Sequence, residues 1–200
     1  MFALIDNQQI TKFYSGNRGV TLGDIQYPKS IFTLWSEAER NTIGIFEVTV
    51  NTTNKKDEQW YINTNVSYGV ESNKAVGSYG TATPKLLEDR NETNEDGSPM
   101  LDDKGNQVVT KGLKSQKKDI IKQQASGLLT PTDWYIIKAT DVESYSVPSA
   151  VTTFRSDVRT KSNTMETAID NASDVDALAT LYEYVNTGTE ENPVMERPLG

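Results

Sequence analysis

VPSAVTTFRSDVRTKSNTMETAID, residues 147–170, carries the clearest periodic pattern in the chain. Its apolar stripe consists of Val151, Phe154, Val158, Met165 and Ile169. They follow one another at spacings of three, four, seven and four, which is the period of one face of an α-helix. Pro148 lies where proline is favoured, in the first helical turn. Position 161 or 162, where the stripe should continue, is Lys or Ser, and one polar layer is a known specificity device in heptad seams. We therefore expect a long helix that packs on a second helix, either within the chain or between chains.

The segments before this helix predict its partners. In residues 113–126, Leu113, Ile120, Ile121 and Leu128 fall on one broad side, with lysines interleaved between them. Pro131 interrupts this helix. Residues 133–139 read either as a short helix capped by Asp133 or as a buried strand, and the Thr-Asp pair favours the helix.

A shorter helix is expected after the break at 171–173. Ser173 as the N-cap and Asp176 three positions later form its start signal. Its apolar stripe would be Leu178, Leu181, Tyr182 and Val185. From Asn186 onward the chain reads as a tail. Residues 164–200 hold eight acids against one base, Arg197, so we expect this part to be solvated or docked on a basic partner.

The first half of the chain has β-strand patterns instead. Residues 2–5 and 10–14 flank a polar turn and predict a hairpin. Ile31, Leu34 and Trp35 form a small apolar cluster, and Ser36 with Glu39 forms a capping box for one or two helical turns. Alternation predicts strands over 43–50 and 60–68.

A polar, acidic stretch separates the two halves. From Thr81 to Asp103 most residues are polar, with turn signals at Asp96-Gly97 and at residues 104–106. Residues 99–101 and 107–110 could pair as a hairpin, so the region is either a linker or an exposed β-arm. We thus expect an α+β protein with a β-rich N-terminal domain (1–80), a polar acidic linker or β-arm (81–111), a helical module (112–186) and an acidic tail (187–200).

Composition excludes several classes of chemistry. The 200 residues include no Cys and no His, so nucleophiles that depend on an imidazole or a thiolate, zinc ribbons and disulfides are ruled out. The net charge of −8 argues against nucleic-acid binding, which needs a basic face. No run of 18 apolar residues exists that could span a membrane, and residues 1–6 lack the basic start of a signal peptide. We expect synthesis in the cytoplasm.

The sequence gives little evidence for a catalytic, metal-binding or phosphate-binding site. Asp133 and Asp141 flank two aromatics, as an acid/base pair would, but a cap and a turn explain them more simply. Asp96, Asp102 and Asp103 lack the ligand spacing of a calcium loop. The glycine clusters match no phosphate-binding motif. We therefore expect a protein that is not an enzyme, without catalytic, cofactor-binding or metal-ligating residues.

The tryptophans and two arginines are stronger candidates for a functional surface. Trp35, Trp60 and Trp134 offer large areas to bury in a core or a subunit interface, or faces on which a sugar could stack. Arg155 and Arg159 lie one turn apart beside the apolar stripe, where Arg is favoured for bidentate interface pairs. Ordinary exposed helix charges would explain these two arginines equally well.

The segment GLLTPTDWYIIK, residues 127–138, resembles a pattern of tailed-phage tail proteins, namely tail-fibre assembly proteins and related tail- or baseplate-associated proteins. In that pattern a helix ending in Ala-x-x-Leu-Leu leads into Thr-Asp-Trp-Tyr, followed by Val-Pro and a helix with Phe-Arg-x-x-Val-Arg. The residues that match in order are Ala125, Leu128, Leu129, Thr132, Asp133, Trp134, Tyr135, Ile137, Lys138, Val147, Pro148, Phe154, Arg155, Val158 and Arg159. The match covers residues 112–185, and the start of the chain is similar in a less specific way. The acidic insertion at 81–106 and the acidic tail depart from the pattern, which leaves open whether such a protein stays in the particle.

The resemblance implies structural roles. Trp134 and Phe154 would join one helix to the next, and Arg155 and Arg159 would face a carboxylate on a neighbouring chain or element. The interface candidates are Trp134, Tyr135, Phe154, Arg155, Val158 and Arg159. The leading hypothesis is a virion tail component, an adaptor or accessory protein at the baseplate or the tail-fibre attachment, acting as a homo-oligomer or in a symmetric assembly with other tail proteins. The alternatives are a transient fibre-assembly chaperone and a carbohydrate-binding receptor module, the latter needing exposed Trp60 or Tyr68.

Overall fold

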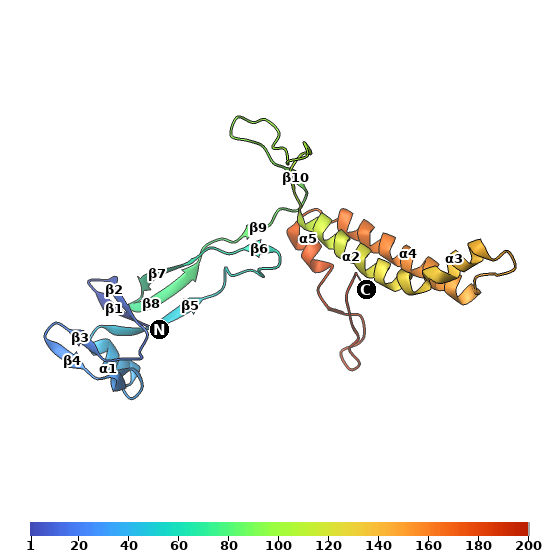
Figure 1. Cartoon of the computed structure of the whole chain (residues 1–200). Coiled ribbons are helices and arrows are strands. Elements are labelled where there is room, and N and C mark those ends of the chain that lie inside the picture. The colour runs from blue at the N-terminus through green and yellow to red at the C-terminus, as the bar shows by residue number, and fades with distance from the viewer. Residues whose placement is uncertain (200) are drawn as a thin grey trace. The chain divides into compact units, whose positions relative to one another are not determined.

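The computed structural model describes residues 1–199 and divides the chain into two compact units, Met1–Thr83 and Pro84–Gly200. The first unit is built of strands with short helical turns, and the second is dominated by long helices (Figure 1). The expected α+β class, with a β-rich N-terminal half and a helical C-terminal half, is confirmed.

The first unit begins with the expected hairpin. Strands β1 (Phe2–Asp6) and β2 (Gln9–Tyr14) pair antiparallel. Asn7 and Gln8 join them with φ values of 47° and 61°. Two consecutive residues with positive φ make the tight turn whose twist matches that of the strands it connects.

A five-stranded sheet grows from this hairpin in the order β2-β1-β5-β8-β7. Strand β5 (Ile45–Asn51) runs antiparallel to β1 and parallel to β8 (Lys74–Tyr79), and β8 pairs antiparallel with β7 (Val66–Glu71). The predicted strand over 60–68 is wrong in its middle, because it splits into β6 (Tyr61–Ile62) and β7. Asn63 and Thr64 leave the ladder because their side chains bind backbone groups of Lys56 and Gly80.

The core of the first unit lies where the sheet meets the segment 20–45. Strands β3 (Val20–Leu22) and β4 (Ile25–Tyr27) lead into the 3-10 turn η1 (Lys29–Phe32). The buried cluster consists of Val20, Ile31, Phe32 and Ile45. Trp35 packs against it as expected, but Leu34 is 80% exposed, so its placement in the cluster was wrong. Ser36 and Glu39 form the predicted capping box of helix α1 (Glu37–Thr42).

The second unit starts with a β-arm. Strand β9 (Thr83–Pro84) lies at the boundary, and β10 (Arg90–Asn91) pairs antiparallel with β11 (Val109–Thr110). The expected pairing of 99–101 with 107–110 is present as the bridge between Leu101 and Gln107. A further bridge joins Thr93 to Pro99, so the arm is a β-structure rather than an extended linker.

Two long helices lie side by side in this unit (Figure 1): α2 (Leu113–Leu129) and α4 (Ser149–Asp170). Pro131 does not break the chain away from α2, because it sits in the 3-10 turn η2 (Thr130–Thr132), which continues directly into α3 (Asp133–Asp141). Residues 133–139 are therefore helical, as favoured. Asp133 is not their cap, since Thr132 holds the N-cap position without a side-chain bond.

The C-terminal segment differs from the expectation in three respects. Helix α5 (Val175–Thr180) has Asp174 as its N-cap rather than Ser173. It ends before Val185, which is 40% exposed and lies in the hairpin of β12 (Val185–Asn186) and β13 (Met195–Glu196). Leu199 is buried and its amide donates to the carbonyl of Leu181, so the end of the described chain returns to the helices.

Candidate protein-interaction surface

Arg155 joins the end of α2 to α3 and α4. Its guanidinium lies 2.8 Å from the Asp133 carboxylate and donates to the Leu129 carbonyl at 2.9 Å and to the Thr132 hydroxyl at 2.5 Å. Only 8% of Arg155 is exposed, whereas half of the Asp133 side chain is open to solvent. The rigid fork of an arginine suits this site, because a helix end leaves carbonyl groups without partners inside the helix.

The two arginines of the sequence pattern thus have different surroundings. Arg155 faces the carboxylate of Asp133, on a neighbouring element of the same chain. Arg159 is exposed, and its guanidinium donates to the Arg155 carbonyl at 3.4 Å. Within residues 1–199 it forms no ion pair, so it is the arginine that remains accessible to a partner.

The aromatic candidates do not hold the helices together in the expected way. Trp134 is 50% exposed and Phe154 is 41% exposed, so neither ring is buried between helices. The ring of Trp134 lies against that of Tyr135, with 3.8 Å between the centroids. Trp134 and Phe154 thus leave large apolar area facing solvent, whereas Arg155, next to Phe154 in the sequence, is buried.

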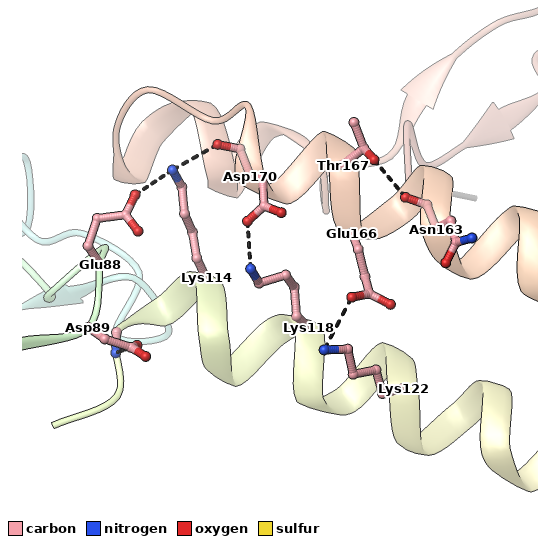
Figure 2. Close-up of polar contacts among 10 residues, drawn as sticks. Glu88, Asp89, Lys114, Lys118, Lys122, Asn163, Glu166, Thr167 and Asp170 are labelled. Carbon is pink, nitrogen blue, oxygen red and sulfur yellow. Dashed lines mark hydrogen bonds and ion pairs between the residues drawn. The ribbon is translucent and has the colours of Figure 1, made fainter. Parts of the chain in front are cut away.

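One side of the α2–α4 pair is held by a ladder of ion pairs, shown in Figure 2. Lys118 lies 2.6 Å from Asp170, and Lys122 lies 3.4 Å from Glu166. Lys114, which is 8% exposed, binds Glu88 at 2.5 Å and the Asp170 carbonyl at 3.0 Å. The hydrogen bond to Asp170 raises the pKa of Lys118 above its ordinary value, so this lysine stays charged.

The sequence reasoning missed this ladder, although a signal was present. Lys114, Lys118 and Lys122 recur every four residues, as do Glu166 and Asp170. Residues four apart lie on one face of a helix, so two antiparallel helices with these repeats can pair acid with base. The lysines looked like interruptions of the apolar pattern only because they were considered on one helix alone.

The base of the β-arm is joined to the start of α2. The backbone amides of Leu113 and Lys114 donate to the carbonyls of Leu86 and Leu87, at 2.8 and 3.1 Å. The Asp89 carboxylate accepts from the Gly112 amide at 2.8 Å, and this bond lowers the pKa of Asp89. Residues 86–89 therefore supply the partners that the first turn of a helix cannot find within itself.

Gln107 organises the arm itself. Its side-chain amide donates to the carbonyls of Glu92, Met100 and Val108, at 2.7, 3.1 and 2.9 Å. The backbones of the same three residues also bond to one another in a ring. The arm is a small structure built on hydrogen bonds with little apolar core, which is typical of a projection that adds contact surface.

The acids of the arm serve its turns. Asp96 accepts from the hydroxyl and the backbone amide of Ser98. Asp102 accepts from the side-chain and backbone amides of Asn106 and from the backbone amide of Lys104. These bonds lower the pKa of both carboxyl groups. Across residues 1–199, acidic side chains form no group of three or more that could hold a metal ion.

The other side of the α2–α4 pair is an apolar groove of about 410 Å³. It is lined by Ile121, Gln124, Ala125, Leu128, Phe154, Asp157, Val158, Lys161, Ser162 and Met165. Phe154 and Val158, both interface candidates, thus lie on the groove, whereas Trp134 and Tyr135 lie on α3. The helical pair is therefore polar on one side, where the ion pairs link the helices, and apolar on the other, where the groove is open.

No family model, curated protein or solved structure matches the chain. Among residues 1–199, no helix combines the length and the apolar character needed to cross a bilayer.

Proposed function

We propose that the chain is a non-enzymatic structural component of a phage tail, acting as an adaptor or accessory protein at the baseplate or the tail-fibre attachment. The observation that carries the proposal is the Arg155 cluster. Leu129, Thr132, Asp133 and Arg155 all belong to the residues that resemble the tail-protein pattern, and they meet in one set of contacts of 2.5–2.9 Å. Leu129, Thr132 and Asp133 come from one segment of the sequence and Arg155 from another. Their contacts give a physical reason for the two segments to occur in one protein, which supports the resemblance.

The surface of the second unit supports a role in assembly. Trp134, Ile136 and Ile137 are 50, 42 and 61% exposed on the single helix α3. Exposed apolar area of this kind is typical of surfaces that a partner covers.

The carbohydrate-binding alternative has less support. It required an exposed Trp60 or Tyr68 on which a sugar ring could stack. Trp60 is 6% exposed, so it offers no face to a sugar. Tyr68 is 42% exposed, although its ring lies edge-on to Phe13 with 5.0 Å between the centroids, so a single ring meets the requirement. The assembly-chaperone alternative uses the same surfaces as the structural role, so only the fate of the protein separates the two.

Mass spectrometry of virions purified from the host strain that carries the gene tests the proposal. A structural component should be present at a fixed ratio to the tail-tube protein, on the order of three or six copies per tail, as closed symmetry gives. Abundance in the lysate with absence from the particles would contradict the proposal and favour the chaperone. Absence from both particles and infected cells would remove the phage context altogether.

A further inference from the structure

On α4 the apolar stripe does not coincide with the face that the helix buries. Its buried residues are Arg155, Ser162 and Ile169, spaced seven apart, and two of these three are polar. Phe154 lies one position before Arg155 and is 41% exposed, while Val158 and Met165 are half-buried. Since each residue advances the helix by about 100°, the buried face is turned away from the apolar stripe, and one apolar edge is left open.

Helix α2 shows the same offset toward the same groove. Ile121 is buried, but Leu128, one of the residues that line the groove, is 54% exposed. The ion pairs of Lys118 and Lys122 link the two helices on the opposite side. Both helices thus present an apolar edge to one side, which is the arrangement that further helices cover in a helical bundle.

The chain itself covers one end of this apolar edge. Tyr182 and Leu199 line a smaller cavity together with Ile120, Ile121 and Met165. Leu199 is buried there. The uncovered part is therefore limited to the stretch around Leu128, Phe154 and Val158, and its occupant must fit between the C-terminal segment and α3.

The rim of the uncovered part carries one acid and one base. Asp157 and Lys161 both line the groove, four residues apart on α4. Lys161 lies at the end toward the C-terminal hairpin, where it lines a second cavity together with Tyr184 and Glu196. Within residues 1–199 neither of them forms an ion pair. Two opposite charges on one helix edge are self-complementary under a two-fold axis that passes between them, because each then meets the other in the second copy.

We infer that a second copy of this chain occupies the groove, with the two α4 helices antiparallel about a two-fold axis at the level of Arg159. Asp157 then faces the Lys161 of the other copy, and the same axis brings Phe154 to the level of the other Met165. The ion pairs of Figure 2 align α2 with α4 so that Leu128 lies at this level too. The two copies of Leu128 therefore flank the axis, and the four helices form a bundle.

The size of the groove sets the expected strength. A stable interface buries about 800 Å² on each partner, from 20–30 residues. The groove is lined by fewer residues than that, so we expect a weak, reversible dimer. The inference is independent of the phage assignment, because purified protein alone tests it.

Sedimentation of the full chain over a range of concentrations is the test. The expected result is a reversible step from the 22.2 kDa monomer to twice that mass. Asp157→Lys should raise the dissociation constant about tenfold, because the two-fold axis repeats each repulsion. The double variant Asp157→Lys with Lys161→Asp should restore it, which a merely structural role for either residue would not do.

Leu128→Glu tests the axis, since it would place two carboxylates beside each other and abolish the dimer. Leu34→Glu is the matched control, because Leu34 is more exposed than Leu128 and belongs to the first unit. Far-UV circular dichroism confirms that each variant is folded. A monomer at all concentrations, a trimer, a charge swap that fails to restore the dimer, or a dimer that survives Leu128→Glu would each overturn the inference.

Discussion

Replacing Arg155 by methionine removes the guanidinium but keeps the length of the side chain. The three groups that it binds, the Leu129 carbonyl, the Thr132 hydroxyl and the Asp133 carboxylate, then lose their shared donor. Because Arg155 is buried, little water can replace it at the end of α2. We expect α3 to lose its attachment to the α2–α4 pair.

The magnitude follows from the contacts. Hydrogen bonds to charged groups contribute about 1.5–3 kcal/mol each, and the ion pair with the half-exposed Asp133 adds only about 0.5 kcal/mol because solvent screens it. The Leu129 carbonyl keeps its bond from the Thr132 hydroxyl at 2.7 Å, so neither group is left without a partner. The expected loss in the free energy of unfolding is therefore about 2–4 kcal/mol.

Urea denaturation of the full chain measures this loss, followed by circular dichroism in the far ultraviolet, where the helical second unit dominates. Arg159→Met is the matched control. That arginine lies one turn away, is exposed and has a single contact at 3.4 Å, so its replacement should cost less than about 0.5 kcal/mol. Arg155→Lys should fall between the two, because it keeps the charge but loses the fork.

Equal effects of Arg155→Met and Arg159→Met would refute the reasoning. A double-mutant cycle with Asp133→Asn then isolates the ion pair, for which we expect a coupling of about 0.5–1 kcal/mol. A coupling near zero would leave only the bonds to Leu129 and Thr132 as the stabilising contacts of Arg155.

Three further predictions concern the caps and the arm. Asp174→Ala removes the carboxylate that accepts from the Ala177 amide at 2.8 Å and should destabilise the second unit by about 1 kcal/mol in the same urea assay. Gln107→Ala removes the donor shared by three carbonyls, so arm amides should exchange with deuterium faster while those of α2 keep their protection. Hydrogen bonds from Asn106 lower the pKa of Asp102 below its ordinary value of 3.8. The folded arm thus holds this carboxylate ionised more strongly than the unfolded chain does, so its stabilisation is complete above about pH 4 and is lost as the pH falls further; the amide shift of Asn106 in NMR titration reports it.

Each of these has a control. Ser173→Ala should leave stability nearly unchanged, because Asp174 and not Ser173 caps α5; the reverse order of effects would contradict the assigned cap. Gln123→Ala, at an exposed position on α2, should leave exchange in the arm unaltered. Asp102→Asn should abolish the acid transition at Asn106, and a transition that persists in this variant would assign it to another group.

Local signals allowed much of the first unit to be predicted. The 2–14 hairpin and the Ser36 capping box depend on residues close together in the sequence, and both are present. The strand over 60–68 failed because Asn63 and Thr64 bind backbone groups at Lys56 and Gly80, and Gly80 is distant in the sequence. The alternation of apolar and polar residues does not show that the side chains of Asn63 and Thr64 compete with the strand for backbone hydrogen bonds.

The second unit shows a different limit. The helical period of residues 147–170 predicted α4 correctly, but it could not predict which face α4 buries. Arg155 and Ser162 are buried because α2 ends in carbonyl and hydroxyl groups that need a donor, and because the lysines of α2 draw the acids of α4 to one side. These causes lie on the partner helix, so one helix considered alone places Phe154 inside and Arg155 at the edge.

Immunogold electron microscopy of purified virions, with antibodies raised against the β-arm peptide 90–110, tests the central claim most directly. The arm is exposed along most of its length, so it should stay accessible on an assembled particle. The proposal predicts gold label at the distal end of the tail, at the baseplate or the fibre attachment. Label on the capsid, or particles without label although the antibody detects the protein in the lysate, would contradict it.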